Sequence, residues 1–132
     1  KNRLKKMKSE LKYIELKSGY ANNGPAWIGM VEFSKSGRTI YFNGKALKNS
    51  KGRGIAGNYY DMESGDEYWV SGVKKDGADR HKNGGGKIWI DRKVVNIYLN
   101  LIECKELDRK RYELIDIQPT KKQLFSELEN EN

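Results

Sequence analysis

The sequence predicts an α+β fold that is mainly β: a small, strongly twisted antiparallel sheet or barrel of about six or seven short strands, with one or two covering helices. Short runs of β-branched and aromatic residues alternate with turns containing Gly and Asn along most of the chain. An Asn-Gly pair at 43–44 joins two of these runs. Helical spacing of apolar residues is clearest after Asp91 and after Pro119.

The first half of the chain predicts a strand at 11–17 and then a three-stranded meander. The meander strands are expected at 27–34, 38–42 and 45–48. Asn43-Gly44 is a strong hairpin signal, because a type I′ turn needs positive φ at both central positions. Alternation places Trp27, Val31 and Phe33 on one face, and Gly29 between them leaves room for another backbone or a ligand.

The second half predicts a hairpin, two more strands and two helices. The hairpin pairs 58–62 with 67–73, a long polar loop covers 74–86, and the later strands are expected at 87–90 and 111–117. Asp91 is placed to cap a helix from 92 to about 103, although the β-branched residues there keep a strand possible. The inner side of that helix carries Val94, Tyr98, Leu101 and Ile102. After Pro119, Thr120 and Gln123 predict a capping box, followed by an amphipathic helix with Leu124, Phe125 and Leu128.

A length of 132 residues suits a single domain. We expect residues 1–10 to form a basic N-terminal arm or a short helix, and residues 11–103 to form the main β-rich domain. Residues 104–132 are expected to add a C-terminal strand and an amphipathic helix, packed on that domain or appended to it.

The net charge of +8 is unevenly placed along the chain. Residues 1–60 hold 13 Lys and Arg against 3 acids, whereas residues 61–132 hold 13 against 15. Clustered cations raise the local potential and displace counterions from phosphates, so the asymmetry favours a polyanionic partner. The same excess also serves solubility.

Cys104 is the only cysteine, which rules out an intramolecular disulfide and favours a reducing compartment. We expect a cytoplasmic protein with no membrane association, because no segment has the roughly 20 apolar residues needed to cross a bilayer. Cys104 falls in the predicted helix among apolar neighbours, where a buried, inert thiol is expected. We expect no cofactor and no metal centre, since a single His and a single Cys cannot build a zinc site.

Several blocks of the sequence resemble a family of short, uncharacterised bacterial proteins. The resemblance runs from about Tyr13 to Ile102, and the blocks that carry it are GPAWIG, FSKSGRT, GNYYD, EYWVSG and KKDGADRH. Members sometimes carry the label 1-deoxy-D-xylulose-5-phosphate synthase, a thiamine-diphosphate enzyme. This chain is far too short for that enzyme's fold, and it lacks the Gly-Asp-Gly followed by an Asn pair. The resemblance therefore implies a bacterial family and no activity.

Residues 52–57 match the spacing G-x-G-x-x-G, which in dinucleotide-binding folds brings backbone N–H groups to a pyrophosphate. The context does not fit, because a polar connection precedes the motif and a β-type segment follows it. A flexible loop is the expected structure. A looser phosphate contact through Lys51 and Arg53 stays possible.

Aromatic residues gather on the two predicted strands of the second hairpin. Cross-strand aromatic pairs commonly stabilise a sheet, and alternation should turn Tyr59 and Tyr60 to opposite faces. Outward aromatics beside a basic loop suit the stacking of bases over cations. The residues expected to bind an anionic ligand are Lys74, Lys75, Arg80, Trp27, Tyr59, Tyr60, Trp69 and Arg53.

The loop after this hairpin concentrates charge and contains the only His. A solvated loop with internal ion pairs is the ordinary interpretation. The catalytic alternative makes His81 an acid or base, Asp79 its orienting partner and Arg80 a phosphate or carboxylate ligand. Asp61 and Glu67 are further candidates, and as hard oxygen ligands they could help to hold Mg²⁺.

Three hypotheses follow. The first is a small basic binding module for an anionic ligand, with nucleic acid as the leading candidate. The second is a small hydrolase or phosphodiesterase that uses the Asp79-Arg80-His81 loop. The third is a protein-interaction adaptor that docks its C-terminal helix into a partner's groove through Leu124, Phe125 and Leu128.

Overall fold

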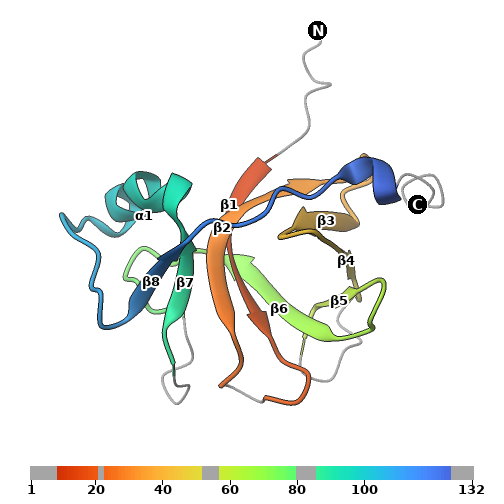
Figure 1. Ribbon diagram of the computed structural model, residues 1–132, viewed down its shortest axis with the longest axis horizontal. Coiled ribbons are helices and arrows are strands. Elements are labelled where there is room, and N and C mark those ends of the chain that lie inside the picture. The colour runs from red at the N-terminus through yellow and green to blue at the C-terminus, as the bar shows by residue number, and fades with distance from the viewer. Residues whose placement is uncertain (1–8, 21–22, 52–56, 80–85, 126–132) are drawn as a thin grey trace, which may run out of the picture.

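The computed structural model describes residues 9–20, 23–51, 57–79 and 86–125. Within these ranges the chain forms one sheet of eight strands in the order β1-β6-β5-β4-β3-β2-β7-β8. Because β1 also pairs with β2, the first six strands close into an antiparallel barrel (Figure 1). The predicted mainly β, barrel-like fold with a covering helix is confirmed.

The barrel strands follow one another around the barrel, so each pairs with its neighbours in sequence. Asn43 and Gly44 both have positive φ, as the type I′ turn requires, and the predicted meander and second hairpin are both present. The strands are β1 (Ser9–Leu16), β2 (Ala26–Phe33), β3 (Thr39–Phe42), β4 (Lys45–Asn49), β5 (Tyr59–Asp61) and β6 (Glu67–Gly72).

The last two strands, β7 (Ile88–Asp91) and β8 (Tyr112–Ile115), correct the expectation of a purely antiparallel sheet. β7 pairs in parallel with β2, and β8 pairs in parallel with β7. The chain leaves β7 through a helical crossover, which returns it to the same end of the sheet, and this connection makes a parallel neighbour possible. Together β7 and β8 extend the sheet outward from β2 (Figure 1).

The crossover begins where the sequence predicted. Asp91 caps a 3₁₀ turn, η2 (Arg92–Val94), by accepting a hydrogen bond from the Lys93 N–H at 3.2 Å, and α1 (Val95–Ile102) follows. The helix ends at Glu103, whose φ is 60°. Cys104 therefore lies beyond the helix and is exposed, so the expectation of a buried thiol is wrong. In the described ranges, no helix is long and apolar enough to span a bilayer.

The inside of the barrel forms one apolar core. Trp27, Val31 and Phe33 share this face of β2, as alternation predicted. Space beside Gly29 is filled, because a Cβ there would lie 2.9 Å from Ile117 Cδ1 and 3.0 Å from Phe42 Cε1. The buried residues of the barrel core are Ile14, Val31, Ile40, Phe42, Leu47, Tyr68, Val70 and Ile117.

A second apolar core lies outside the barrel, between the sheet and α1. Tyr98 on the helix and Tyr112 on β8 are buried there, with their hydroxyl oxygens 2.6 Å apart. Adjacent residues Tyr13 and Ile14 of β1 point into different cores, as the strand period of two requires. The buried residues of this outer core are Tyr13, Ala26, Ile28, Ile88, Ile90, Val94, Tyr98 and Tyr112.

The C-terminal segment crosses β2 and packs on the barrel (Figure 1). We call residues 116–120 the strap. The Gln118 N–H donates to Asn43 Oδ1, and the Gly44 N–H donates to Thr120 Oγ1 at 2.8 Å. Thr120 thus bonds to the β3–β4 turn, and the described part of the predicted helix is a 3₁₀ turn, η3 (Lys122–Phe125). Phe125 is buried against Tyr41.

Candidate binding surfaces

The barrel walls separate the predicted aromatic residues into two groups. Trp27 and Tyr59 point inward and pack against the barrel core. The Trp27 ring lies 6.5 Å from that of Tyr68, and burial raises the pKa of Tyr59. Tyr60 and Trp69 lie at the alternate positions, on the outside of the barrel.

Tyr60, Trp69 and Lys48 share the outer side of three adjacent strands, and we call them the outer aromatic face. Tyr60 on β5 is directly opposite Lys48 on β4 and Glu67 on β6. Trp69 is a diagonal neighbour of Tyr60 two positions further along β6, a separation that aromatic side chains can bridge. The Trp69 side chain is 42% exposed, which is high for so large an apolar group in a strand.

Three cations lie together at the end of β4: Arg38, Lys48 and Lys51. The Asn49 N–H donates to the Arg38 carbonyl at 2.8 Å, and the Lys51 N–H donates to Asn49 Oδ1 at 2.6 Å. These bonds bring the backbones of Arg38 and Lys51 to Asn49, next to Lys48, and Lys48 is the one that lies directly opposite Tyr60. None of the three forms an ion pair with a described residue. Arg53 lies outside the described residues.

The loop after β6 packs toward the outer core. The Lys74 N–H donates to Asp79 Oδ1 at 2.8 Å, and Arg111 donates to the Gly77 carbonyl at 3.1 Å. Lys74 and Lys75 are exposed at its start. Arg80 and His81 lie outside the described residues.

Asp79 has a structural role within this loop. One carboxylate oxygen binds Lys74, while Oδ2 is buried and has no hydrogen-bond partner among the described residues. Burial raises the pKa of Asp79, and the bond from the Lys74 backbone partly offsets the rise. The pKa of Tyr98 is also raised, chiefly by burial, with the charge of Asp79 adding to the effect.

Asp61 and Glu67, the other candidate carboxylates, also bind backbone groups. Asp61 Oδ1 accepts the Glu63 N–H at 2.8 Å in the turn between β5 and β6. Glu67 Oε1 accepts the Gly57 N–H at 3.1 Å. Over the described ranges, no group of three His, Cys, Asp or Glu residues is placed to hold a metal ion.

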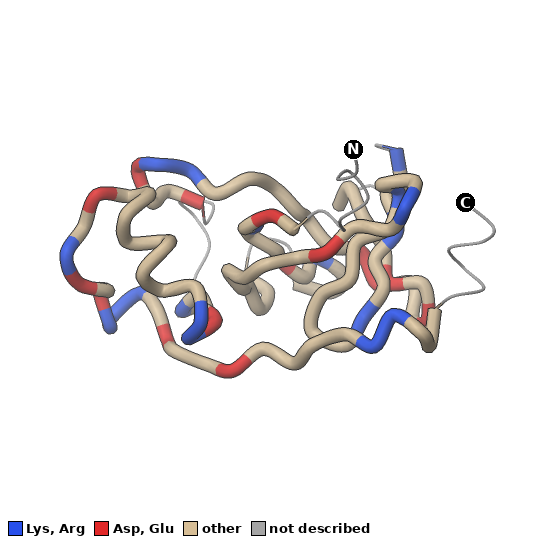
Figure 2. Tube along the Cα trace, turned by 90° about the horizontal axis from the view of Figure 1, so that it is seen from above, with Lys and Arg blue, Asp and Glu red and all other residues tan. Residues whose placement is uncertain are grey.

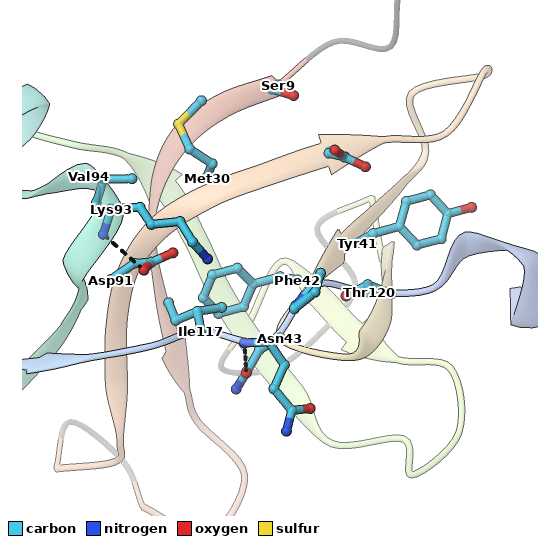
Figure 3. Close-up of a pocket in the computed structure, with 13 residues that line it drawn as sticks. Ser9, Met30, Tyr41, Phe42, Asn43, Asp91, Lys93, Val94, Ile117 and Thr120 are labelled. Carbon is cyan, nitrogen blue, oxygen red and sulfur yellow. Dashed lines mark hydrogen bonds between the residues drawn. The ribbon is translucent and has the colours of Figure 1, made fainter.

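A cavity of about 310 Å³ opens where β3 and β7 diverge from β2, and we call it the fork cavity. Phe42 and Ile117 form its floor, and the Lys93 side chain extends across it (Figure 3). Met30 also lines the cavity, and its side chain is 40% exposed. At the rim Lys122 pairs with Glu32 at 2.8 Å. The close approach predicted at Gly29 is the sequence signal that lies beside this cavity.

Charges of both signs are interspersed along the described chain (Figure 2). Along the described residues, the cations therefore do not form one continuous basic band. The potential that an anion meets at a surface depends on the charges nearby. A local group of cations without ion-pair partners therefore attracts an anion more strongly than the total charge alone would indicate.

The fold defines a small closed β-barrel with a two-strand extension and a helix over its outer core. Comparison with protein-family models, curated proteins and solved structures finds no match to this chain. The bacterial family resemblance stays a prediction.

Proposed function

We propose that the protein is a non-enzymatic binding module that holds single-stranded nucleic acid on its outer aromatic face. The observation that carries the proposal is the outward Tyr60, directly opposite Lys48 and diagonal to the exposed Trp69, with Arg38 and Lys51 held next to Lys48 through Asn49. None of the three cations forms an ion pair with a described residue. Bases stack on aromatic side chains without regard to sequence, and cations alongside contact the phosphates. Tyr60, Trp69 and Lys48 supply both on one wall of the barrel.

Nucleic acid suits this wall better than a small anion does. The wall is an open strand surface, and a lone phosphate there would compete with water for exposed cations. A polymer adds stacking on Tyr60 and Trp69 to each phosphate contact, so several weak contacts sum along one chain. The hydrolase hypothesis gains no support from the described carboxylates, because Asp61, Glu67 and Asp79 all accept hydrogen bonds from the backbone.

The test is fluorescence anisotropy with short labelled oligo(dT) and oligo(U) at low and moderate salt. We expect binding that weakens with salt, with a slope of log K against log salt of about −2 if three phosphates are contacted on a single strand. The variant R38Q/K48Q/K51Q should bind about tenfold more weakly or worse and show a shallower slope. Trp69→Ala should weaken binding while leaving the slope unchanged, because stacking releases no counterions.

The matched control is R109Q/K105Q/K110Q, which removes three exposed cations from the loop between α1 and β8. Both triple variants lower the net charge equally, so a general electrostatic attraction would weaken equally in the two. Equal losses, or no binding by the unaltered protein at low salt, would overturn the proposal.

A further inference from the structure

The fork in the sheet leaves one residue of β2 without a strand partner on one side. Pairing of β2 with β7 ends at Ile28, and pairing with β3 begins at Glu32. Met30 lies between these positions. Among the described residues, no strand pairs with Met30 on this side and no loop hydrogen bond reaches it.

The direction of the Met30 backbone groups follows from the ladder. The Ser34 N–H donates to the Thr39 carbonyl, so Ser34 faces β3. Alternate residues of a strand direct their N–H and C=O groups to the same side, and Met30 therefore faces the fork as well. Its N–H donor and C=O acceptor lie next to each other at the edge of the fork cavity, with Met30 among the lining residues.

We infer that the fork cavity binds a small planar ligand with a lactam edge, the adjoining N–H and C=O of a cyclic amide, as in a uracil ring. Such an edge pairs with Met30 as one residue of a strand pairs with another, donating to its C=O and accepting from its N–H. The cavity volume of about 310 Å³ lies at the small end of the range for ligand pockets. Phe42 and Ile117 supply an apolar floor for a ring.

A longer peptide strand does not fit the same donor and acceptor. It would have to run beside β2, where β3 and β7 already occupy the ladder on either side of Met30. Lys93 gives the ring a second contact: its side chain extends across the hollow and forms no ion pair with a described residue (Figure 3). Its ammonium can donate to the second carbonyl of an imide such as uracil.

The inference is independent of the nucleic-acid surface, so it is tested with the neutral nucleoside uridine, which carries no phosphate. We expect uridine to shift the backbone amide resonance of Met30 saturably in a ¹H–¹⁵N titration at millimolar concentration. 3-Methyluridine, in which a methyl group replaces the N–H of the lactam edge, should bind at least about tenfold more weakly. Lys93→Gln should weaken uridine binding several-fold, whereas Lys87→Gln, at the other end of β7, should not.

A variant that fills the cavity supplies a second test. Met30→Trp places a larger side chain at the rim and should abolish the uridine response, while Ile97→Trp, on the exposed side of α1, should leave it intact. Hydrogen exchange tests the premise directly, because the Met30 amide should exchange much faster than those of Ile28 and Glu32. A protected Met30 amide, or equal responses to uridine and 3-methyluridine, would overturn the inference.

Discussion

Gly29 is the residue at which the barrel core, the strap and the fork meet. It has no Cβ, and the space that a Cβ would take holds the tips of Ile117 and Phe42. The strap can therefore insert Ile117 between the diverging strands and close the core.

Asp79 is a buried carboxylate in the loop after β6. One of its oxygens accepts a hydrogen bond from the Lys74 N–H at the start of that loop, and the other has no hydrogen-bond partner among the described residues.

Gly29→Ala should lower the free energy of unfolding by about 1 to 3 kcal/mol, the usual cost of overpacking a core. The new methyl would lie 2.9 Å from Ile117 Cδ1. Ile117→Val removes that Cδ1 atom and costs about 1 kcal/mol alone. In the double variant, the loss of unfolding free energy should be smaller than the sum of the losses in the two single variants. Urea denaturation of all four proteins measures this coupling, and strict additivity would contradict it.

Asp79 should make stability fall as the pH rises. Its pKa in the folded protein is raised above the ordinary value of 3.8. The resulting stabilisation is fully present below pH 3.8 and is lost as the pH rises through the raised pKa of the folded state. Asp79→Asn keeps an oxygen for the Lys74 N–H and should remove this pH dependence without loss of stability at pH 7. Asp79→Ala should be less stable by about 1 to 3 kcal/mol, because a donor loses its partner. Thermal unfolding between pH 3.5 and pH 7, as an approximate range, tests both variants.

At the level of elements, the strap and η3 join the C-terminal segment to the barrel. Ile117 lies in the barrel core, Thr120 accepts a bond from Gly44, and Phe125 packs on Tyr41. The adaptor hypothesis needed this helix to present its apolar side to a partner. Phe125 is instead buried in this protein's own core. Leu124 is the large apolar side chain of η3 that is exposed, and Leu128 lies outside the described residues.

Phe125 and Leu124 form a matched pair for testing this role. Phe125 is 5% exposed and Leu124 is 75% exposed. Phe125→Ala should cost about 3 kcal/mol, since it empties a buried aromatic site, whereas Leu124→Ala should change stability by no more than about 0.5 kcal/mol. Chemical denaturation measures both. Similar small effects would show that η3 does not stabilise the barrel.

At the scale of the whole molecule, two apolar cores share one pair of strands. β1 and β2 direct alternate side chains into the barrel and into the outer core, so neither core can form without them. The closed barrel gives each of its six strands a partner on both sides. Among the described residues, unpaired backbone groups remain at the fork in β2 and on the outer edge of β8. The outer aromatic face and the fork cavity thus lie on different strands of one barrel.

The local signals in the sequence determined most of the strands and which side chains face outward. Asn43-Gly44 sets its turn by backbone conformation alone, and the period of two separates Tyr59 from Tyr60 whatever the partner strand. Only the tertiary structure decided that β1 pairs with both β6 and β2, that β7 and β8 run parallel, and that the strap inserts Ile117 beside Gly29. These features depend on contacts between residues far apart in sequence, which leave no local pattern. The cations at the end of β4 and the unpaired backbone groups of Met30 also depend on the tertiary structure. A group lacks an ion-pair or hydrogen-bond partner only with respect to the residues that the fold places around it.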